Sequence, residues 1–219
     1  MIIKVCGMAV PNNIRGLLNL GLIDWMGMIF YPQSKGYLPS FGFSPEDYLS
    51  INIPKVGVFV NADFKDIEEK VKQYGLQMVQ LHGDESVELV KQVKDRLGVE
   101  VIKVFRIGGH WDWKVLLPYE NWVDRFLFDT DGPTYGGTGS RFNWEILKKY
   151  TLNKPFILSG GIDKDSISAI LDCYRKKPTM EGIDINSKFE FQPGKKNLEM
   201  IHQFSSQIKA ALSEDTRLK

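Results

Sequence analysis

A carboxylate that ends an apolar run near the middle of the chain is the first candidate for chemistry. The run 126–128 (Phe-Leu-Phe) leads to Asp129, and a loop with glycines at positions 132, 136, 137 and 139 follows. Aspartate is rarely buried without a partner, so Asp129 needs either a hydrogen-bonding role or a reactive one. A glycine-rich loop also lets backbone pass close to a ligand. From these residues alone, a catalytic carboxylate and a loop-capping aspartate are equally good interpretations.

Reactive side chains also follow other short apolar runs. A thiol, an imidazole and a guanidinium in such positions could form an acid–base site together with Asp129. Each also has a simpler interpretation: the thiol as a small buried side chain, the imidazole as a hydrogen-bonded neighbour, and the guanidinium as the partner of an acid at the rim. These residues are Cys6, His82 and Arg106.

Two turns near the end of the chain have the composition of an anion site. Gly160 and Gly161 follow an apolar run and precede a helix-like segment, whose first backbone N–H groups could face an anion. Asn186 and Ser187 supply amide and hydroxyl donors after the next apolar run. A phosphate site is therefore favoured over a simple tight turn at Gly160 and Gly161.

The elements that must position these residues are short strands alternating with helices. Eight such repeats at a spacing of about 25 residues predict a single-domain α/β fold, the (β/α)8 TIM barrel, in which residues after each strand gather at one face. An open doubly wound sheet is the alternative, but it would not need eight units. Asp63 and Asp84 are the expected caps of two helices, which Gly75 and Gly98 end. We expect the barrel to occupy residues 1–212 and a polar, fraying tail to occupy 213–219. The predicted strands are 2–6, 25–30, 55–60, 78–81, 99–105, 126–129, 155–159 and 180–185; the predicted helices are 11–20, a short one after 44, 63–74, 84–97, one within 111–122, 143–150, 163–174 and 195–212.

Composition excludes several classes of protein. With 28 basic and 27 acidic residues the net charge is +1, so we expect no nucleic-acid partner and no membrane-surface partner. No stretch approaches the roughly 20 apolar residues of a membrane span. The two cysteines form no CxxC pair and the three histidines are scattered, so we expect no metal, and a reducing cytoplasm as the compartment. The absence of a P-loop or a GxGxxG motif favours a reaction without a cofactor.

Several motifs, in order along the chain, resemble those of the phosphoribosylanthranilate isomerase family of tryptophan biosynthesis. They are 4–8 (KVCGM), 27–30 (GMIF), 56–60 (VGVFV), 79–85 (VQLHGDE), 128–130 (FDT) with 135–139 (YGGTG), 158–161 (LSGG) and 182–186 (GIDIN). The resemblance implies a (β/α)8 barrel that binds a small phosphosugar, works without metal or cofactor, and is a monomer or a homodimer. It also implies an Amadori rearrangement of N-(5-phosphoribosyl)anthranilate.

The resemblance further assigns roles to individual residues. Cys6 would be the general base and Asp129 the general acid. Such roles require a raised pKa at Asp129 and a lowered pKa at Cys6, the latter through nearby positive charge such as Lys4. Substrate-binding roles would fall on Lys35, His82, Arg106 and Gly137, and phosphate-binding roles on Gly160, Gly161, Asn186 and Ser187.

One position departs from the family pattern. Gly36 stands where the family usually has the arginine that holds the anthranilate carboxylate. Lys35 could supply a point charge instead, and Arg106 or Arg15 could substitute from elsewhere. Two rival functions remain: the related isomerase of the histidine pathway, against which Cys6 argues, and a barrel that only binds phosphosugars, against which the Cys6 and Asp129 pair argues.

Overall fold

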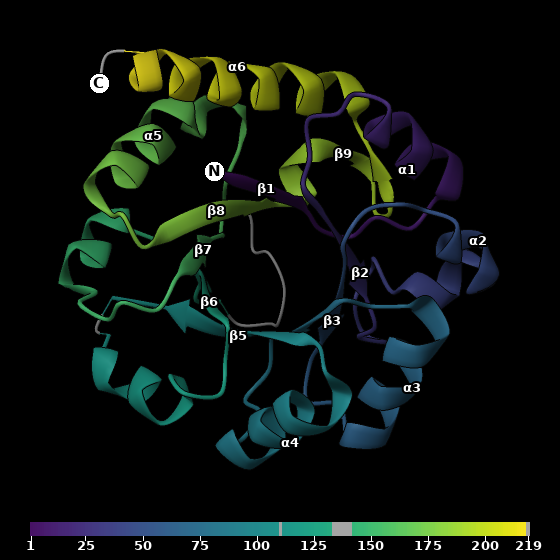
Figure 1. Ribbon diagram of the computed structural model, residues 1–219. Coiled ribbons are helices and arrows are strands. Elements are labelled where there is room, and N and C mark those ends of the chain that lie inside the picture. Colours follow the sequence, from purple (N-terminus) through teal and green to yellow (C-terminus); the bar gives the residue numbers. More distant parts are fainter. Residues whose placement is uncertain (110, 133–141, 218–219) are drawn as a thin grey trace.

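Eight parallel strands close into a barrel, which confirms the predicted (β/α)8 fold (Figure 1). The structure, a computed structural model, describes residues 1–109, 111–132 and 142–217. The first and last barrel strands pair through Ile2 with Gly182 and Lys4 with Asp184, so segments 180 residues apart lie side by side. The strands are β1 (Ile2–Val5), β2 (Trp25–Ile29), β3 (Lys55–Phe59), β4 (Met78–Leu81), β5 (Glu100–Ile107), β6 (Arg125–Thr130), β7 (Phe156–Leu158) and β8 (Met180–Ile185).

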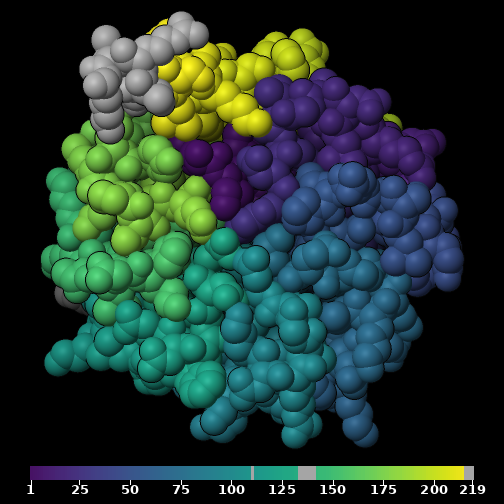
Figure 2. Space-filling view, in the orientation of Figure 1, coloured from purple at the N-terminus to yellow at the C-terminus, as the bar shows by residue number. Residues whose placement is uncertain are grey.

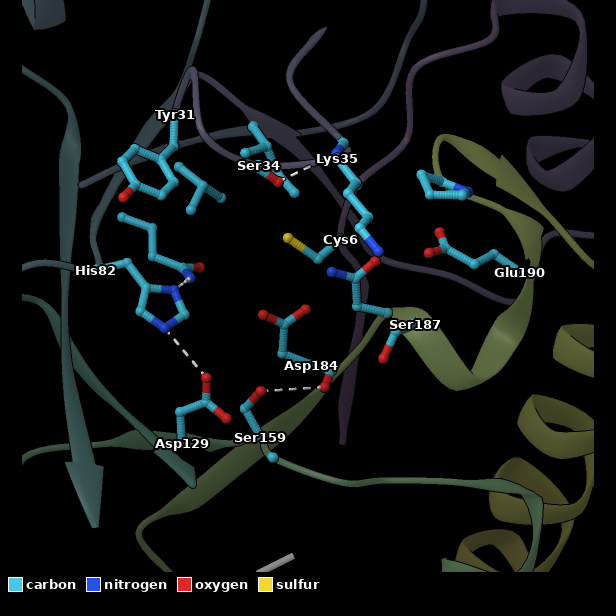
Figure 3. Close-up of a pocket in the computed structure, with 18 of the residues that line it drawn as sticks. Cys6, Tyr31, Ser34, Lys35, His82, Asp129, Ser159, Asp184, Ser187 and Glu190 are labelled. Atoms are coloured by element: carbon cyan, nitrogen blue, oxygen red, sulfur yellow. Dashed lines mark hydrogen bonds and ion pairs between the residues drawn. The ribbon is translucent and has the colours of Figure 1, made fainter. Parts of the chain in front are cut away.

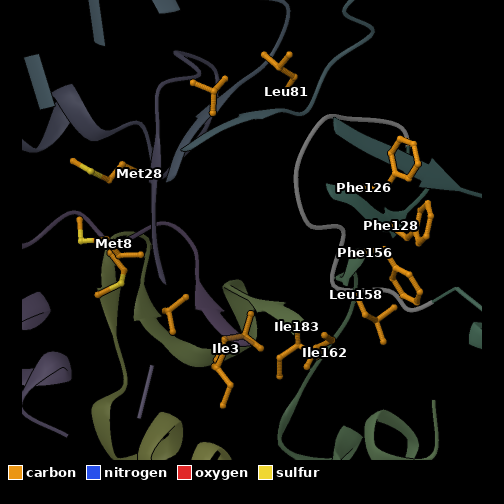
Figure 4. Close-up of a cluster of buried hydrophobic side chains, with 14 of the residues drawn as sticks. Ile3, Met8, Met28, Leu81, Phe126, Phe128, Phe156, Leu158, Ile162 and Ile183 are labelled. Atoms are coloured by element: carbon orange, nitrogen blue, oxygen red, sulfur yellow. The ribbon is translucent and has the colours of Figure 1, made fainter. Parts of the chain in front are cut away.

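Apolar side chains on both faces of the strands create two cores. Inside the barrel, Val56, Ile102 and Leu127 belong to a small buried hydrophobic cluster. Outward-facing side chains form the larger cluster between strands and helices, in which the rings of Phe128 and Phe156 lie 5.0 Å apart (Figure 4). Burial on both faces is the reason these strands contain so few polar residues.

Helices surround the barrel, and several predicted helix ends are confirmed. The Asp63 carboxylate accepts a hydrogen bond from the Asp66 amide at 2.9 Å, and Gly75 and Gly98 end their helices in the left-handed conformation. The α-helices are α1 (Pro11–Leu18), α2 (Glu46–Leu49), α3 (Phe64–Tyr74), α4 (Val87–Leu97), α5 (Ile167–Lys176) and α6 (Leu198–Arg217); the 3-10 helices are η1 (Leu38–Phe41), η2 (Trp113–Tyr119), η3 (Trp144–Lys149), η4 (Lys164–Ser166) and η5 (Ser187–Phe189).

Other predicted boundaries were wrong. Ser86, not Asp84, caps α4: its hydroxyl accepts a hydrogen bond from the Leu89 amide. The fifth and sixth helical segments are 3-10 helices, and Pro118 inside η2 cannot donate an α-helical hydrogen bond. The last helix begins at Leu198 rather than at 195 and continues to Arg217, into the segment predicted as a tail.

A short hairpin before the last helix was not predicted. Strands β9 (Glu190–Gln192) and β10 (Lys195–Lys196) pair antiparallel between β8 and α6. Helix α6 then lies against the N-terminal part of the chain, where its yellow surface meets the purple one (Figure 2). Among the described residues, no helix is both long enough and apolar enough to cross a membrane.

Candidate active site

A cavity of about 710 Å³ opens where the carboxyl ends of the strands meet (Figure 3). Side chains that are far apart in the sequence face this cavity, because parallel strands of a barrel all end at the same face. Most of the predicted site residues line it: Cys6, Lys35, His82, Asp129, Gly160, Gly161, Asn186 and Ser187.

Asp129 is held at the end of β6 by two neighbours. Its Oδ1 accepts a hydrogen bond from the Thr130 amide at 2.8 Å, and its Oδ2 lies 3.1 Å from Nε2 of His82. Nδ1 of His82 lies 3.3 Å from Nε2 of the Gln80 side-chain amide, on strand β4. When that amide donates, Nδ1 is the acceptor and Nε2–H donates to Asp129. The hydrogen bond from the Thr130 amide agrees with the loop-capping interpretation, and the reactive interpretation of Asp129 stays a prediction.

Cys6 lies across the cavity at the end of β1, in space left by a glycine. A Cβ on Gly27 would lie 2.8 Å from the Cys6 sulfur and 3.0 Å from the Lys4 ammonium, so only glycine leaves both groups their room. Lys4 is fully buried and donates to Asp184 at 2.7 Å. The expected lowering of the thiol pKa is wrong for the ligand-free protein: burial raises the pKa of Cys6, although the charge of Lys4 opposes this.

The predicted anion turns lie together at one side of the cavity. Gly160 and Gly161 both have positive φ angles, +84° and +64°, and a Cβ on Gly160 would lie 2.9 Å from Oδ1 of Asp129. The expected open helix end behind them was wrong: the Asp163 carboxylate caps η4 by accepting from the Asp165 amide. The Asp165 amide is therefore not free to bind an anion at this turn.

The unpredicted hairpin supports the other anion turn. Lys196 is fully buried and donates to Oδ1 of Asn186 at 2.7 Å and to Oε2 of Glu190 at 2.6 Å. Its backbone is fixed to α1, because Asn13 exchanges two hydrogen bonds with it. Asn186 is therefore oriented by a lysine from a different element.

Of the other residues predicted to bind the substrate, some line the cavity and some do not. Lys35 reaches into the cavity on the side of Ser187 and Glu190 (Figure 3), and Gly36 lies beside it. Arg106 does not line the cavity formed by the described residues; it pairs with Asp84 at 3.2 Å. Arg15 is also elsewhere, at Asn12 on α1, and Gly137 lies outside the described residues.

With this geometry in place, the chain can be compared with known proteins. The family model of N-(5'-phosphoribosyl)anthranilate (PRA) isomerase matches residues 3–207. The chain belongs to this family. Its relatives include the N-(5'-phosphoribosyl)anthranilate isomerases of Phocaeicola vulgatus, 44% identical over 209 residues, and Parabacteroides distasonis, 43% identical over 210 residues. The alignments cover 95% of this chain in both cases, and 98% and 93% of the relatives.

Solved structures of phosphoribosylanthranilate isomerases share the architecture. The enzyme of Thermotoga maritima is 31% identical with a TM-score of 0.80, and the match covers 96% of this chain and all of that one. A complex of a phosphoribosylanthranilate isomerase with reduced 1-(o-carboxyphenylamino)-1-deoxyribulose 5-phosphate is 29% identical with a TM-score of 0.76, over the same shares of the two chains.

Two buried charged residues of this family member were missed in the sequence: Asp184 lines the cavity, and Lys196 holds Asn186. Asp184 is the last residue but one of strand β8, between two isoleucines, and Lys196 follows the Pro193-Gly194 turn of the hairpin. A carboxylate in one apolar strand and a lysine in another both need a partner when buried, so the pairing of Asp184 with Lys4 could have been predicted. A Pro-Gly pair marks a turn, so it also argued against a helix that starts at 195.

The described part of the chain contains no cluster of three or more histidine, cysteine, aspartate or glutamate side chains that could hold a metal ion.

Proposed function

We propose that Cys6 and Asp129 carry out the reaction of this family, the Amadori rearrangement of N-(5-phosphoribosyl)anthranilate to 1-(2-carboxyphenylamino)-1-deoxyribulose 5-phosphate. The observation that supports this assignment is that a thiol and a carboxylate, from β1 and β6, face one cavity from different sides (Figure 3). The rearrangement needs one group that gives a proton and another that removes one from a carbon of the same sugar.

Asp129 is the proposed acid. It protonates the furanose ring oxygen, the ring opens, and C1′ becomes the carbon of a protonated Schiff base. His82, 3.1 Å away, fixes the carboxylate in place and stabilises the charge that remains on it after the proton has left.

Cys6 is the proposed base, and its burial determines when it acts. Because burial raises the pKa of the free thiol, the ligand-free protein holds this residue protonated. The positive Schiff base favours the thiolate, so the thiol loses its proton to water, and the thiolate then removes the C2′ proton to give an enolamine. The enolamine then tautomerises to the ketone.

The two charged groups of the substrate are assigned to different residues of the cavity. The phosphate is assigned to the turns at Gly160, Gly161, Asn186 and Ser187, with backbone and side-chain donors at hand. The anthranilate carboxylate is assigned to Lys35, whose ammonium provides charge without the bidentate geometry of an arginine.

The test is the loss of fluorescence of freshly generated phosphoribosylanthranilate on addition of the protein. Cys6→Ala and Asp129→Asn should each lower kcat on the order of 10²–10⁴-fold, as single acid–base groups do. Cys173→Ala is the matched control, because this second free cysteine lies outside the cavity. A near-normal kcat in either cavity variant removes that residue from the mechanism, and absence of turnover in the unaltered protein rejects the function.

We further propose that the catalytic domain spans residues 1–212, that it works in the cytoplasm, and that it is a monomer or a homodimer. A structure of the Thermotoga maritima relative is described as monomers generated from a dimeric enzyme, which supports considering both states. Sedimentation equilibrium over a range of concentrations distinguishes them.

A further inference from the structure

Asp184 has one carboxylate oxygen that the protein does not use. Its Oδ2 accepts from the Lys4 ammonium at 2.7 Å, whereas its Oδ1 is buried and has no hydrogen-bond partner among the described residues. A buried acceptor without a donor is unfavourable, so such an oxygen in a cavity wall points to a donor on a ligand.

The other carboxylates around the cavity are already engaged. Asp129 has one oxygen on the Thr130 amide and the other at His82, and Glu190 accepts from Lys196. Gln80 also has an unpartnered buried oxygen, but its side chain is held at His82, whereas Asp184 lies between Cys6 and Asp129 (Figure 3). Among the described residues, Asp184 is therefore the acceptor best placed to meet a ligand.

The position of Asp184 indicates which donor it would meet. Under the proposed function, Cys6 removes the proton from C2′. The 2′-hydroxyl is bonded to this same carbon and therefore lies next to the thiol. Asp184 lies on the neighbouring strand β8, where it pairs in register with Lys4, two residues before Cys6. From this geometry, and resting on the proposed function, we infer that Oδ1 of Asp184 accepts a hydrogen bond from the 2′-hydroxyl of the sugar and thereby makes the site specific for a ribose over a 2-deoxyribose.

This contact has a consequence for the reaction. A hydroxyl fixed at Asp184 sets the rotation about the C1′–C2′ bond once the ring is open, so that the C2′ hydrogen points at the Cys6 sulfur. A substrate without this hydroxyl leaves the carboxylate unpaired, and unpaired buried polar groups are the strongest source of discrimination against an analogue.

The test measures binding to the whole protein by calorimetry, with ribose 5-phosphate, 2-deoxyribose 5-phosphate and inorganic phosphate as the three probes. We expect the 2-deoxy sugar to bind on the order of 10- to 100-fold more weakly than the ribose sugar. Inorganic phosphate reports the phosphate turns alone and gives the baseline. Equal affinity of the unaltered protein for the two sugars overturns the inference.

Variants locate the effect on Asp184. In Asp184→Leu no acceptor remains for the hydroxyl, so the preference for ribose should shrink to less than about 3-fold while phosphate affinity stays unchanged. If this variant does not fold, the double variant Lys4→Met/Asp184→Leu removes both charges together and should likewise lose the preference. A preference that persists in a folded variant shows that another group reads the hydroxyl, and overturns the assignment.

Turnover separates this inference from the proposed function. A protein that isomerises phosphoribosylanthranilate but binds both sugars equally keeps the function and loses the inference. A protein that prefers ribose but shows no turnover keeps the hydroxyl contact and loses the isomerase mechanism.

Discussion

The buried pair of Lys4 and Asp184 makes a strong prediction about stability. The two charges lie 2.7 Å apart, with side-chain exposures of 0% and 6%. Removal of one partner from such a pair leaves an uncompensated charge and costs about 3–5 kcal/mol, whereas removal of both in favour of apolar side chains is close to neutral. Lys4→Met and Asp184→Leu should therefore each lower the free energy of unfolding by about 3–5 kcal/mol.

The double variant gives the decisive number. Additive effects would total roughly 6–10 kcal/mol, comparable with the roughly 5–15 kcal/mol that stabilises a typical domain. We expect the double variant to lie within about 2 kcal/mol of the unaltered protein, which is a coupling energy of at least about 4 kcal/mol.

The assay is urea unfolding followed by the fluorescence of the five tryptophans, with all four proteins of the cycle compared at one pH. A matched control is the pair Lys176 and Asp172, which also lie 2.7 Å apart but are each 54% exposed. Its coupling should be below about 1 kcal/mol, because water screens exposed charges. Additive losses at Lys4 and Asp184 would refute the argument that burial makes the two charges depend on each other.

Three further outcomes follow from named contacts. Gly160→Ala should lower the free energy of unfolding by more than about 2 kcal/mol and also lower kcat, because a Cβ there would clash with atoms of Thr130. Gly98→Ala is the control, since Gly98 has a similar positive φ and no atom within 4 Å of the added Cβ. It should cost only the conformational strain, about 1 kcal/mol. The rate at which iodoacetamide alkylates Cys6 should still increase with pH at pH 9, because burial raises the thiol pKa and the thiolate becomes the main form only above it. A rate that levels off below pH 8 contradicts the raised pKa. Gly36→Arg should lower KM for phosphoribosylanthranilate with little change in kcat, and an unchanged KM in steady-state assays would mean that the carboxylate is already held.

Most of the barrel was predictable because its signals are local. Each strand is an apolar run between turn residues, and Asp63 and Gly75 have the side chain and the backbone freedom that their caps require. The predicted cap of α4 was wrong because Asp84 and Ser86 are both good capping residues; in the fold Asp84 pairs with Arg106 of β5, and Ser86 caps the helix. Sequence alone does not supply that contact.

The site was predictable to the extent that strand ends define it. Cys6, His82 and Asp129 could be grouped because each follows an apolar run. The pairing of Lys4 with Asp184 depends on closure of the barrel between residues 180 positions apart, and only the fold creates it. The predicted lowering of the Cys6 pKa was wrong for the same reason, because the burial of the thiol depends on neighbours from several strands.

The hairpin that holds Asn186 has a consequence for how the protein is made. Lys196 bonds to Asn186 and also to Asn13, on the first helix of the chain. A chain still emerging from the ribosome contains Cys6, His82 and Asp129 long before Lys196 appears, but the anion turn cannot be completed until that lysine reaches it. Domains generally fold as units during synthesis, starting from the N-terminus. The turn proposed to bind the phosphate thus forms only after residue 196 has been made and has docked against the first helix.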